Sequence, residues 1–454
     1  IILMTATLDK SKLLFDNRYL RQLIIPLLIE TLLSVTIGMM DTIMVSTVGE
    51  HAVSGVSLVD SVANLFVFLF SAFATGGAVI ASQYLGKKDK EAACFSAKQL
   101  MYLSSSFSIA VSLILLIFRE PMMHLVYGSI EESVMSSALD YLTPILLSFP
   151  FLAVLNSINA LFRSMGKSSI TMTVSIIMNV INVTGNAILI NVVGIGAMGA
   201  GIASLLSRAV ACFFMLYKIT RKKEEVHIEK PFKLEVDFPM IGRVLKIALP
   251  SGIENSIFHI GKILVSSTVA SFGTASIAAN AVFNGLATFA NIPGNAVGMA
   301  AVTVIGQCCG ARNYDAASYY GKKLMKLTYL MNFFTCTTMF ILAPELALLY
   351  SLSPAAYSLA VEATRLNMFQ TFLFWPPAFT IPNYLRAAGD AKYTMVVSII
   401  SMWLFRVVLS RILGVNLGLG FIGVLWGMFI DWYFRGICFI IRFAKGEWKK
   451  KTVV

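Results

Sequence analysis

The sequence predicts an all-α membrane protein that crosses the bilayer many times. Its composition, its long apolar segments and an internal repeat support this prediction. Of the 454 residues, 57% are hydrophobic and only 13% are charged, and the mean hydropathy is +0.77. Soluble domains are about 45–50% apolar and about 25% charged. Because one soluble core cannot bury this much apolar chain, we expect the lipid bilayer to surround most of it.

Twelve apolar segments are long enough to cross a bilayer. A transmembrane helix needs about 20 mostly apolar residues, and only a helix satisfies all of its own backbone hydrogen bonds in lipid. We therefore expect twelve transmembrane helices. The predicted spans lie near residues 15–45, 54–84, 98–118, 138–163, 168–192, 196–218, 246–272, 276–306, 323–345, 364–386, 392–414 and 420–443.

The net charge of +12 does not predict a nucleic-acid partner, because the basic residues follow the topology of a membrane protein. Lysine and arginine are concentrated in alternate connections, such as GKKDK (86–90), KITRKK (218–223) and KKK (449–451). The opposite connection REPMMHLVYG (119–128) contains Arg119 as its one arginine or lysine. Cytoplasmic loops carry such an excess of basic residues. We therefore expect a multi-pass protein of the cytoplasmic membrane with both termini in the cytoplasm.

The chain repeats itself after a shift of 224 residues. The matching residues are Pro26 with Pro250, Glu30 with Glu254, Gln83 with Gln307, Gly86 with Gly310, and Gly194, Gly196 and Gly199 with Gly418, Gly420 and Gly423. Each half holds six predicted spans, so both halves begin on the same side of the membrane. The repeat predicts two pseudo-symmetric six-helix bundles around a central cavity, at 15–218 and 246–445, joined by a cytoplasmic linker at 219–245. Parallel repeats of this kind suit transport by alternating access.

Several motifs resemble the multidrug and toxic compound extrusion (MATE) family of secondary antiporters. They are IPLLIETLLSVTIGMMDTIMVSTVG (25–49), ASQYLGKKDKEAA (81–93), LFRSMGKSS (161–169), GQCCGARNYDAA (306–317) and YLRAAGDAKYT (384–394). The resemblance implies a transporter, not an enzyme, that exports organic, often cationic, compounds in exchange for protons or sodium. We expect it to act as a monomer. No GxxxxGK[ST] motif indicates an ATP site, so we expect an ion gradient to drive transport, with no cofactor besides the coupling ion.

The resemblance also implies an ion-coupling site in the first half. In the family, an aspartate about four turns after a proline of the first span is tied to ion coupling, and Asp41 follows Pro26 at this distance. Family positions in the fifth span correspond to Asn182 and Asn186. Sodium-coupled members carry a glutamate where this chain has Phe258, and an acid in the tenth span, where this chain has none. The resemblance therefore favours a proton at Asp41 over sodium.

Charges inside the predicted spans need a reason, because each costs about 2.5–3.5 kcal/mol or more at the centre of a membrane. A buried carboxylate lowers this cost by binding a proton, so we interpret Asp41 as a proton site; the alternative is an acid stabilised by neighbouring hydrogen bonds. Glu30 and its repeat partner Glu254 are candidates for coupling or for gating. Lys262 is a candidate cavity charge that could pair with Glu254 or Asp41, bind an anionic group, take the place of a coupled cation or serve the structure. Arg406 is a second candidate, which could bridge to a carboxylate across the cavity or bond backbone carbonyls.

Other features complete the prediction. Asp431 and Arg435 are four residues apart and suggest an ion pair within one helix. Pro376, Pro377 and Pro382 predict an irregular tenth helix. His259 lacks a second ligand at metal spacing, so no metal site is expected. Candidate substrate-lining residues are Phe66, Phe70, Phe283, Phe289, Met299, Phe372 and Trp375.

Two other functions compete with export of small organic molecules. One is a flippase for a lipid-linked or phosphate-bearing precursor, in which Lys262 and Arg406 would meet phosphates. Such flippases often have fourteen spans, whereas twelve are predicted here. The other is a passive channel or a membrane enzyme. An enzyme should carry a compact group of catalytic residues, and the sequence suggests none.

Overall fold

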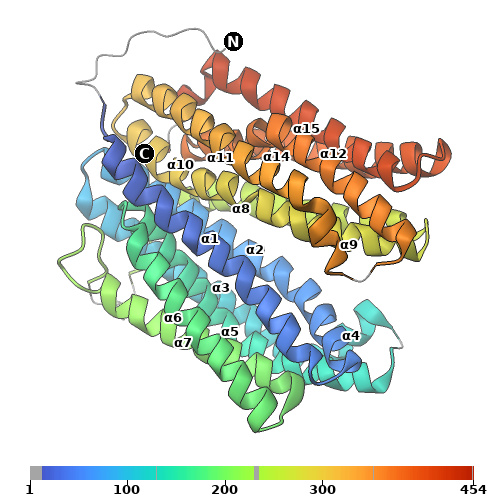
Figure 1. The fold of residues 1–454 in the computed structure, drawn as a ribbon. Helices are drawn as coiled ribbons and strands as arrows, with labels where there is room; N and C mark the ends of the chain where they lie inside the picture. Colours follow the sequence, from blue (N-terminus) through green and yellow to red (C-terminus); the bar gives the residue numbers. More distant parts are fainter. Residues whose placement is uncertain (1–12, 129, 230–234, 351, 452) are drawn as a thin grey trace. The chain divides into compact units, whose positions relative to one another are not determined.

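We describe a computed structural model of the chain, which covers residues 13–128, 130–229, 235–350, 352–451 and 453–454 (Figure 1). These residues form helices joined by short connections, and none of them lies in a β-strand. The chain divides into two compact units. The N-terminal unit is residues 25–252, and the C-terminal unit combines the described residues before 25 with residues 253 onward.

The N-terminal unit is built around α5, which packs against α2, α3 and α7. Its elements are α1 (Asn17–Ser46, which begins in the C-terminal unit), α2 (Glu50–Gly86), α3 (Lys90–Ile117), α4 (Arg119–Tyr127), α5 (Glu132–Ser164), α6 (Ser168–Asn186), the π-helix η2 (Ala187–Val192) and α7 (Gly196–Ile219). Phe70 and Phe149 are fully buried in its core, with ring centroids 5.4 Å apart. Aromatic side chains of this size supply much of the apolar area that a core buries.

The C-terminal unit is centred on α12, which packs against α9, α11 and α15. Its elements are α8 (Phe238–Ala270, which begins in the N-terminal unit), α9 (Thr274–Ala290), α10 (Ile292–Gly310), α11 (Tyr314–Leu348), α12 (Pro354–Phe379), α13 (Ile381–Ala387), α14 (Ala391–Ser401), the π-helices η3 (Met402–Leu409) and η4 (Ile412–Asn416), α15 (Gly420–Lys445) and the 3₁₀-helix η5 (Glu447–Lys450). Close approach of α10 and α12 requires Gly294, because a Cβ there would lie 2.0 Å from the Trp375 ring.

Each of the twelve predicted spans lies on a helix or on consecutive helices of this structure. Among the described residues, ten helices are each long and apolar enough to cross a membrane. The span at 276–306 is divided at Asn291 into α9 and α10, and Pro293 lies in the first turn of α10. The irregular tenth helix is confirmed. Its first part, α12, ends at Phe379 shortly after Pro376 and Pro377, and its second part, α13, has Pro382 in its first turn.

The internal repeat extends to fine details of the backbone. Lys88 and Arg312 are the two residues other than glycine with positive φ in the described chain, at 63° and 56°. Each precedes a helix whose first turn is capped: the side chain of Asp89 accepts a bond from the Ala92 amide, and that of Asn313 from the Ala316 amide, both at 3.0 Å. The π-helices η2 and η4 also occupy equivalent positions. The two halves therefore share backbone conformation, helix caps and π-helices, and not only similar residues.

Candidate functional site

Asp41 lies in the second half of α1 and contacts the end of α6. The side-chain nitrogen of Asn186 donates a hydrogen bond of 2.5 Å to Asp41 Oδ1. Asn186 is fully buried, and its nitrogen also lies 3.5 Å from the side-chain oxygen of Asn182, one turn earlier. The structure thus brings Asp41, Asn182 and Asn186 together, as the family resemblance implies.

The side-chain amides of Asn182 and Asn186 lie at the end of α6, where the helix changes its geometry. Asn186 is its last α-helical residue, and the chain continues as the π-helix η2, a feature that often occurs at functional sites. The Asn182 side chain donates to Ser204 Oγ on α7 at 3.2 Å, which fixes its orientation. Asn179 differs, because its side chain bonds the Ser175 carbonyl oxygen of its own helix. The cluster therefore joins α1, α6 and α7.

A second acid and a basic residue that sequence reasoning missed lie near this cluster. Asp60 on α2 accepts a hydrogen bond of 3.2 Å from the hydroxyl of Tyr141 on α5. Arg208 on α7 attracts both Asp41 and Asp60 electrostatically, and it donates to Ser148 Oγ at 2.7 Å. Asp60 and Arg208 lie inside predicted spans, so the rule that identified Asp41 could have identified them too. Nothing in the sequence marks Tyr141 in the same way.

The charges of this N-terminal polar cluster (Asp41, Asp60, Tyr141, Asn182, Asn186, Ser204 and Arg208) determine what it can bind. Two ionised carboxylates and one guanidinium leave one negative charge. Charges interact strongly where the effective dielectric constant is low, so one proton or one monovalent cation would neutralise the cluster. A proton on the Asp41 carboxyl would also make it a hydrogen-bond donor and change its bond with Asn186. Among the described residues, no three His, Cys, Asp or Glu side chains form a metal site.

Glu30 has a different environment from Asp41. Its Oε1 lies 2.9 Å from Arg163 Nη1 in an ion pair, and its Oε2 accepts a bond of 2.7 Å from Thr171. Both carboxylate oxygens therefore have partners on neighbouring helices. The repeat partner Glu254 forms the equivalent ion pair with Arg386, at 2.7 Å.

Glu254 is the centre of a buried network in the C-terminal unit. Besides Arg386, it contacts Arg435 at 3.5 Å and accepts a bond of 2.7 Å from Ser398. Nearby, Arg406 on η3 pairs with Asp431 on α15 at 3.1 Å, and both side chains are almost completely buried. The predicted pair between Asp431 and Arg435 is wrong, because each side chain turns to a partner on another helix.

The predicted role of Lys262 as a partner of Glu254 is also not realised. Glu254 pairs with Arg386 and Arg435 instead. Within the described chain, the Lys262 ammonium has neither a hydrogen bond nor an ion-pair partner. Its side chain is exposed in the isolated chain. Lys262 and Arg406 are nevertheless close enough to repel each other electrostatically.

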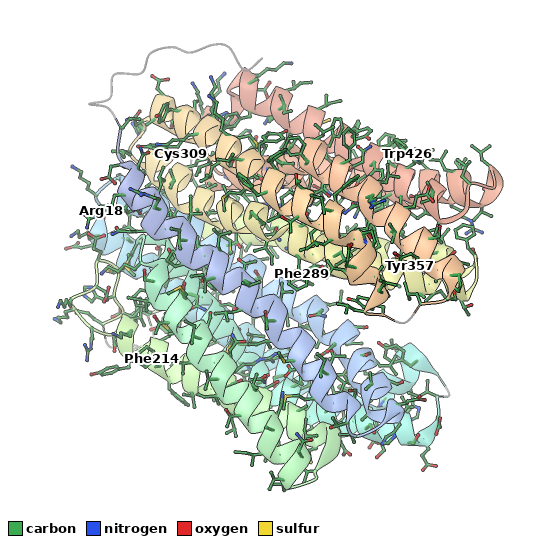
Figure 2. All side chains as sticks on the ribbon, in the orientation of Figure 1. Arg18, Phe214, Phe289, Cys309, Tyr357 and Trp426 are labelled. Carbon is green, nitrogen blue, oxygen red and sulfur yellow. The ribbon has the colours of Figure 1, made fainter. Side chains whose placement is uncertain are left out.

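The predicted substrate-lining side chains fall into two groups. Phe70, Phe283 and Trp375 are packed inside the cores of their units. The others are only partly buried: Phe66, Phe289 (labelled in Figure 2), Met299 and Phe372. The first group packs the helices in this structure, so the second group is better placed to meet another molecule.

Comparison with known proteins gives matches along the whole chain. A family model described as MatE matches residues 26–188 and again residues 250–412, so the two matches begin and end 224 residues apart. The chain is 27% identical over 437 residues to the "Uncharacterized transporter YisQ" of Bacillus subtilis, and the match covers 94% of this chain and 94% of the relative. It is 23% identical over 454 residues to the "Probable multidrug resistance protein NorM" of Thermotoga maritima, covering 98% of this chain and 96% of the relative.

Solved structures share the fold. One is described as "Outward-facing conformation of a multidrug resistance MATE family transporter of the MOP superfamily", with a TM-score of 0.87, 19% identity and 96% of each chain covered. Another is described as "Reverse polarity of binding pocket suggests different function of a MOP superfamily transporter from Pyrococcus furiosus". It has a TM-score of 0.87 and 20% identity, with 96% of this chain and 97% of the other covered. At this identity, the likeness supports the twelve-helix, two-bundle fold.

Proposed function

Because the chain belongs to the MATE family of transporters and is not an enzyme, we propose that it is a secondary active antiporter that exports organic compounds in exchange for protons. The observation that carries the proposal is the polar cluster around Asp41. An acid that binds a proton when buried and releases it when wetted can couple a proton to a conformational change. We also propose that the protein lies in the cytoplasmic membrane, with both termini in the cytoplasm, and that it acts as a monomer.

Among its described residues, the C-terminal unit has no equivalent of this cluster, which supports a single coupling site. Repeat symmetry places Val265, Arg406 and Ser410 at the positions of Asp41, Asn182 and Asn186. The acids near this region are already paired with arginines. A basic environment of this kind does not favour a second cation, so we place coupling in the N-terminal unit.

A proton is favoured over sodium for two reasons. Phe258 occupies the position at which sodium-coupled relatives are expected to carry a glutamate, and its ring lies against two arginines. The N-terminal cluster, in contrast, offers Asp41 a short bond from the Asn186 amide, which a change in protonation would alter directly. The multidrug names of the relatives lead us to propose cationic or amphipathic substrates.

Reconstituted vesicles test this proposal. We expect an imposed pH gradient to drive transport of a fluorescent organic cation, and a protonophore to abolish it. A sodium gradient at matched pH should drive none. Transport by the sodium gradient alone would overturn proton coupling. Failure of both gradients with cationic, zwitterionic and anionic probes would overturn the exporter proposal.

Asn186→Ala is expected to reduce proton-driven transport about tenfold or more. A hydrogen bond to a charged group contributes about 1.5–3 kcal/mol, and about 1.4 kcal/mol corresponds to a factor of ten. Initial rates under a pH gradient, divided by the amount of reconstituted protein, measure the effect. Asn179→Ala is the matched control on the same helix, because the Asn179 side chain bonds its own backbone. Equal rates for the two variants would contradict a role for Asn186.

A further inference from the structure

The helix α8 carries a polar stripe that the proposed proton site does not use. Asn255, His259, Lys262 and Ser266 follow one another at intervals of four, three and four residues, so they share one face. Exposed apolar side chains occupy the other side of the helix at Ile253, Ile260, Ile263 and Leu264. Lipid-facing positions in a membrane helix are apolar, whereas charged residues face the protein interior or water. The stripe, including Lys262, is therefore not on the lipid-facing side of α8.

The stripe borders the face of α8 that packs inside the C-terminal unit. Glu254 is buried on that face, and Phe258 lies one turn later. Gly261 allows close contact with η3, because a Cβ there would lie 2.2 Å from Met402 Cε. Arg406 is one turn beyond Met402, and its guanidinium carbon lies 5.0 Å from the Phe258 ring centre. These contacts explain why Lys262 and Arg406 come close enough to repel each other.

The charges in this region do not balance. Three arginines (Arg386, Arg406 and Arg435) surround two carboxylates, those of Glu254 and Asp431. Lys262 adds a further positive charge, and among the described residues it has no acidic partner. Arg435 is 3% exposed, and its Nε and Nη1 atoms have no hydrogen-bond partner within the described structure. When ionised, the five groups and Lys262 together carry an excess of two positive charges.

Such an excess inside a membrane is costly unless an anion offsets it. An ammonium group, with a guanidinium close enough to interact with it electrostatically, provides several N–H donors for the oxygen atoms of a carboxylate or a phosphate. We propose that Lys262, in the positive field of Arg406, binds a compact anionic group of the transported compound. A compound that carries a carboxylate or phosphate together with a cationic group then fits better than a pure cation. Anion binding at Lys262 is argued from the charges alone. The further step, that the anion is part of the transported compound, rests on the proposed export function.

Binding to the purified full-length protein tests this inference without any ion gradient. The probes are naphthalene carboxylate, the uncharged naphthalene carboxamide and inorganic phosphate, in an uncharged maltoside detergent and a chloride-free buffer. A ligand that binds the folded state raises its unfolding temperature, so titrations yield apparent dissociation constants. We expect the carboxylate to stabilise the wild type and the carboxamide to have little effect. The carboxylate should also bind more tightly than phosphate.

Variants then assign the effect to Lys262. Lys262→Met and Lys262→Gln should weaken carboxylate binding about tenfold or more, as expected for the loss of a charge-assisted hydrogen bond. Lys262→Arg should retain binding. Lys246→Met, on the same helix but outside the stripe, should bind like the wild type. We use two neutral substitutions so that the test does not depend on one variant folding.

Specific outcomes would overturn the inference. Equal stabilisation by the carboxylate and the carboxamide, or undiminished preference for the carboxylate in both neutral variants, would show that Lys262 does not bind an anion. Tighter, Lys262-dependent binding of phosphate would indicate a site for a free inorganic anion and not for a group of the transported compound. Because binding is measured in detergent, failure of gradient-driven transport would leave a positive binding result unaffected, and so the two proposals fail separately.

Discussion

Replacing Asp41 by asparagine is expected to abolish proton-driven efflux while the protein remains folded. Asparagine has nearly the same shape as aspartate but cannot bind and release a proton near neutral pH. The loss of the Asp41 charge also leaves Arg208 facing Asp60 alone, so the N-terminal polar cluster becomes neutral. The variant should then behave as a transporter whose coupling ion is permanently bound.

Proteoliposomes with an imposed pH gradient measure this effect as the initial rate of dye transport. Asp140→Asn is a suitable control, because Asp140 is an exposed acid on α5. Gel filtration and thermal unfolding establish that both variants are folded. If Asp41→Asn transported the dye at the wild-type initial rate, the proposed mechanism would be wrong.

Asp60→Asn extends the same experiment to the second acid. Asp60 interacts electrostatically with Asp41 and Arg208, but its bond from Tyr141 is longer than that between Asn186 and Asp41. We therefore expect Asp60→Asn to slow transport less than Asp41→Asn. The opposite order would move the proton site to Asp60 and leave Asp41 as the supporting residue.

The asymmetry between Asp41 and Glu30 shows what the sequence could predict. The repeat pairs Glu30 with Glu254 but gives Asp41 no acidic counterpart, and this difference distinguishes Asp41 by sequence alone. The helical spans and the repeat are likewise predictable from the chain, whereas the group of Asp41 with Asn182 and Asn186 follows from the resemblance to the MATE family. Long apolar segments and a fixed shift are properties of the chain itself, so they can be recognised without knowledge of tertiary contacts.

The partners of the other charges are not predictable in this way. Arg163 is 133 residues from Glu30, and Arg386 is 132 residues from Glu254, so no local pattern connects them. The position of Arg163 near the end of a predicted span suggests a basic residue at the membrane surface, yet it forms an ion pair with Glu30. Helical spacing places Asp431 beside Arg435, but spacing does not decide which of several nearby cations an acid selects.

The ion pairs of Glu254 and Glu30 lead to the second large expected effect. Removing one partner of a buried ion pair typically costs about 3–5 kcal/mol, because the other charge remains buried without compensation. Glu254→Gln leaves Arg386 and Arg435 in this state. We therefore expect a large loss of stability in this variant, measured as a fall in the unfolding temperature of the purified protein.

Glu30→Gln is the matched comparison in the other repeat. Its carboxylate pairs with Arg163, and the two side chains are 12% and 19% exposed, against 5% and 14% for Glu254 and Arg386. Partial exposure lets water replace part of the lost interaction, so we expect a smaller loss of stability than for Glu254→Gln. Equal unfolding temperatures of the two variants would contradict this order.

A double variant and a transport assay separate a structural role of Glu254 from a coupling role. Glu254→Gln combined with Arg386→Met removes the uncompensated charge on Arg386 together with its partner, so part of the lost stability should return, as in a double-mutant cycle. If Glu254 serves only the architecture, the folded fraction of Glu254→Gln should still transport with a pH gradient. A stable Glu254→Gln protein that no longer couples transport to protons would instead place Glu254 in the coupling machinery, and would show that both repeats contribute an acid to it.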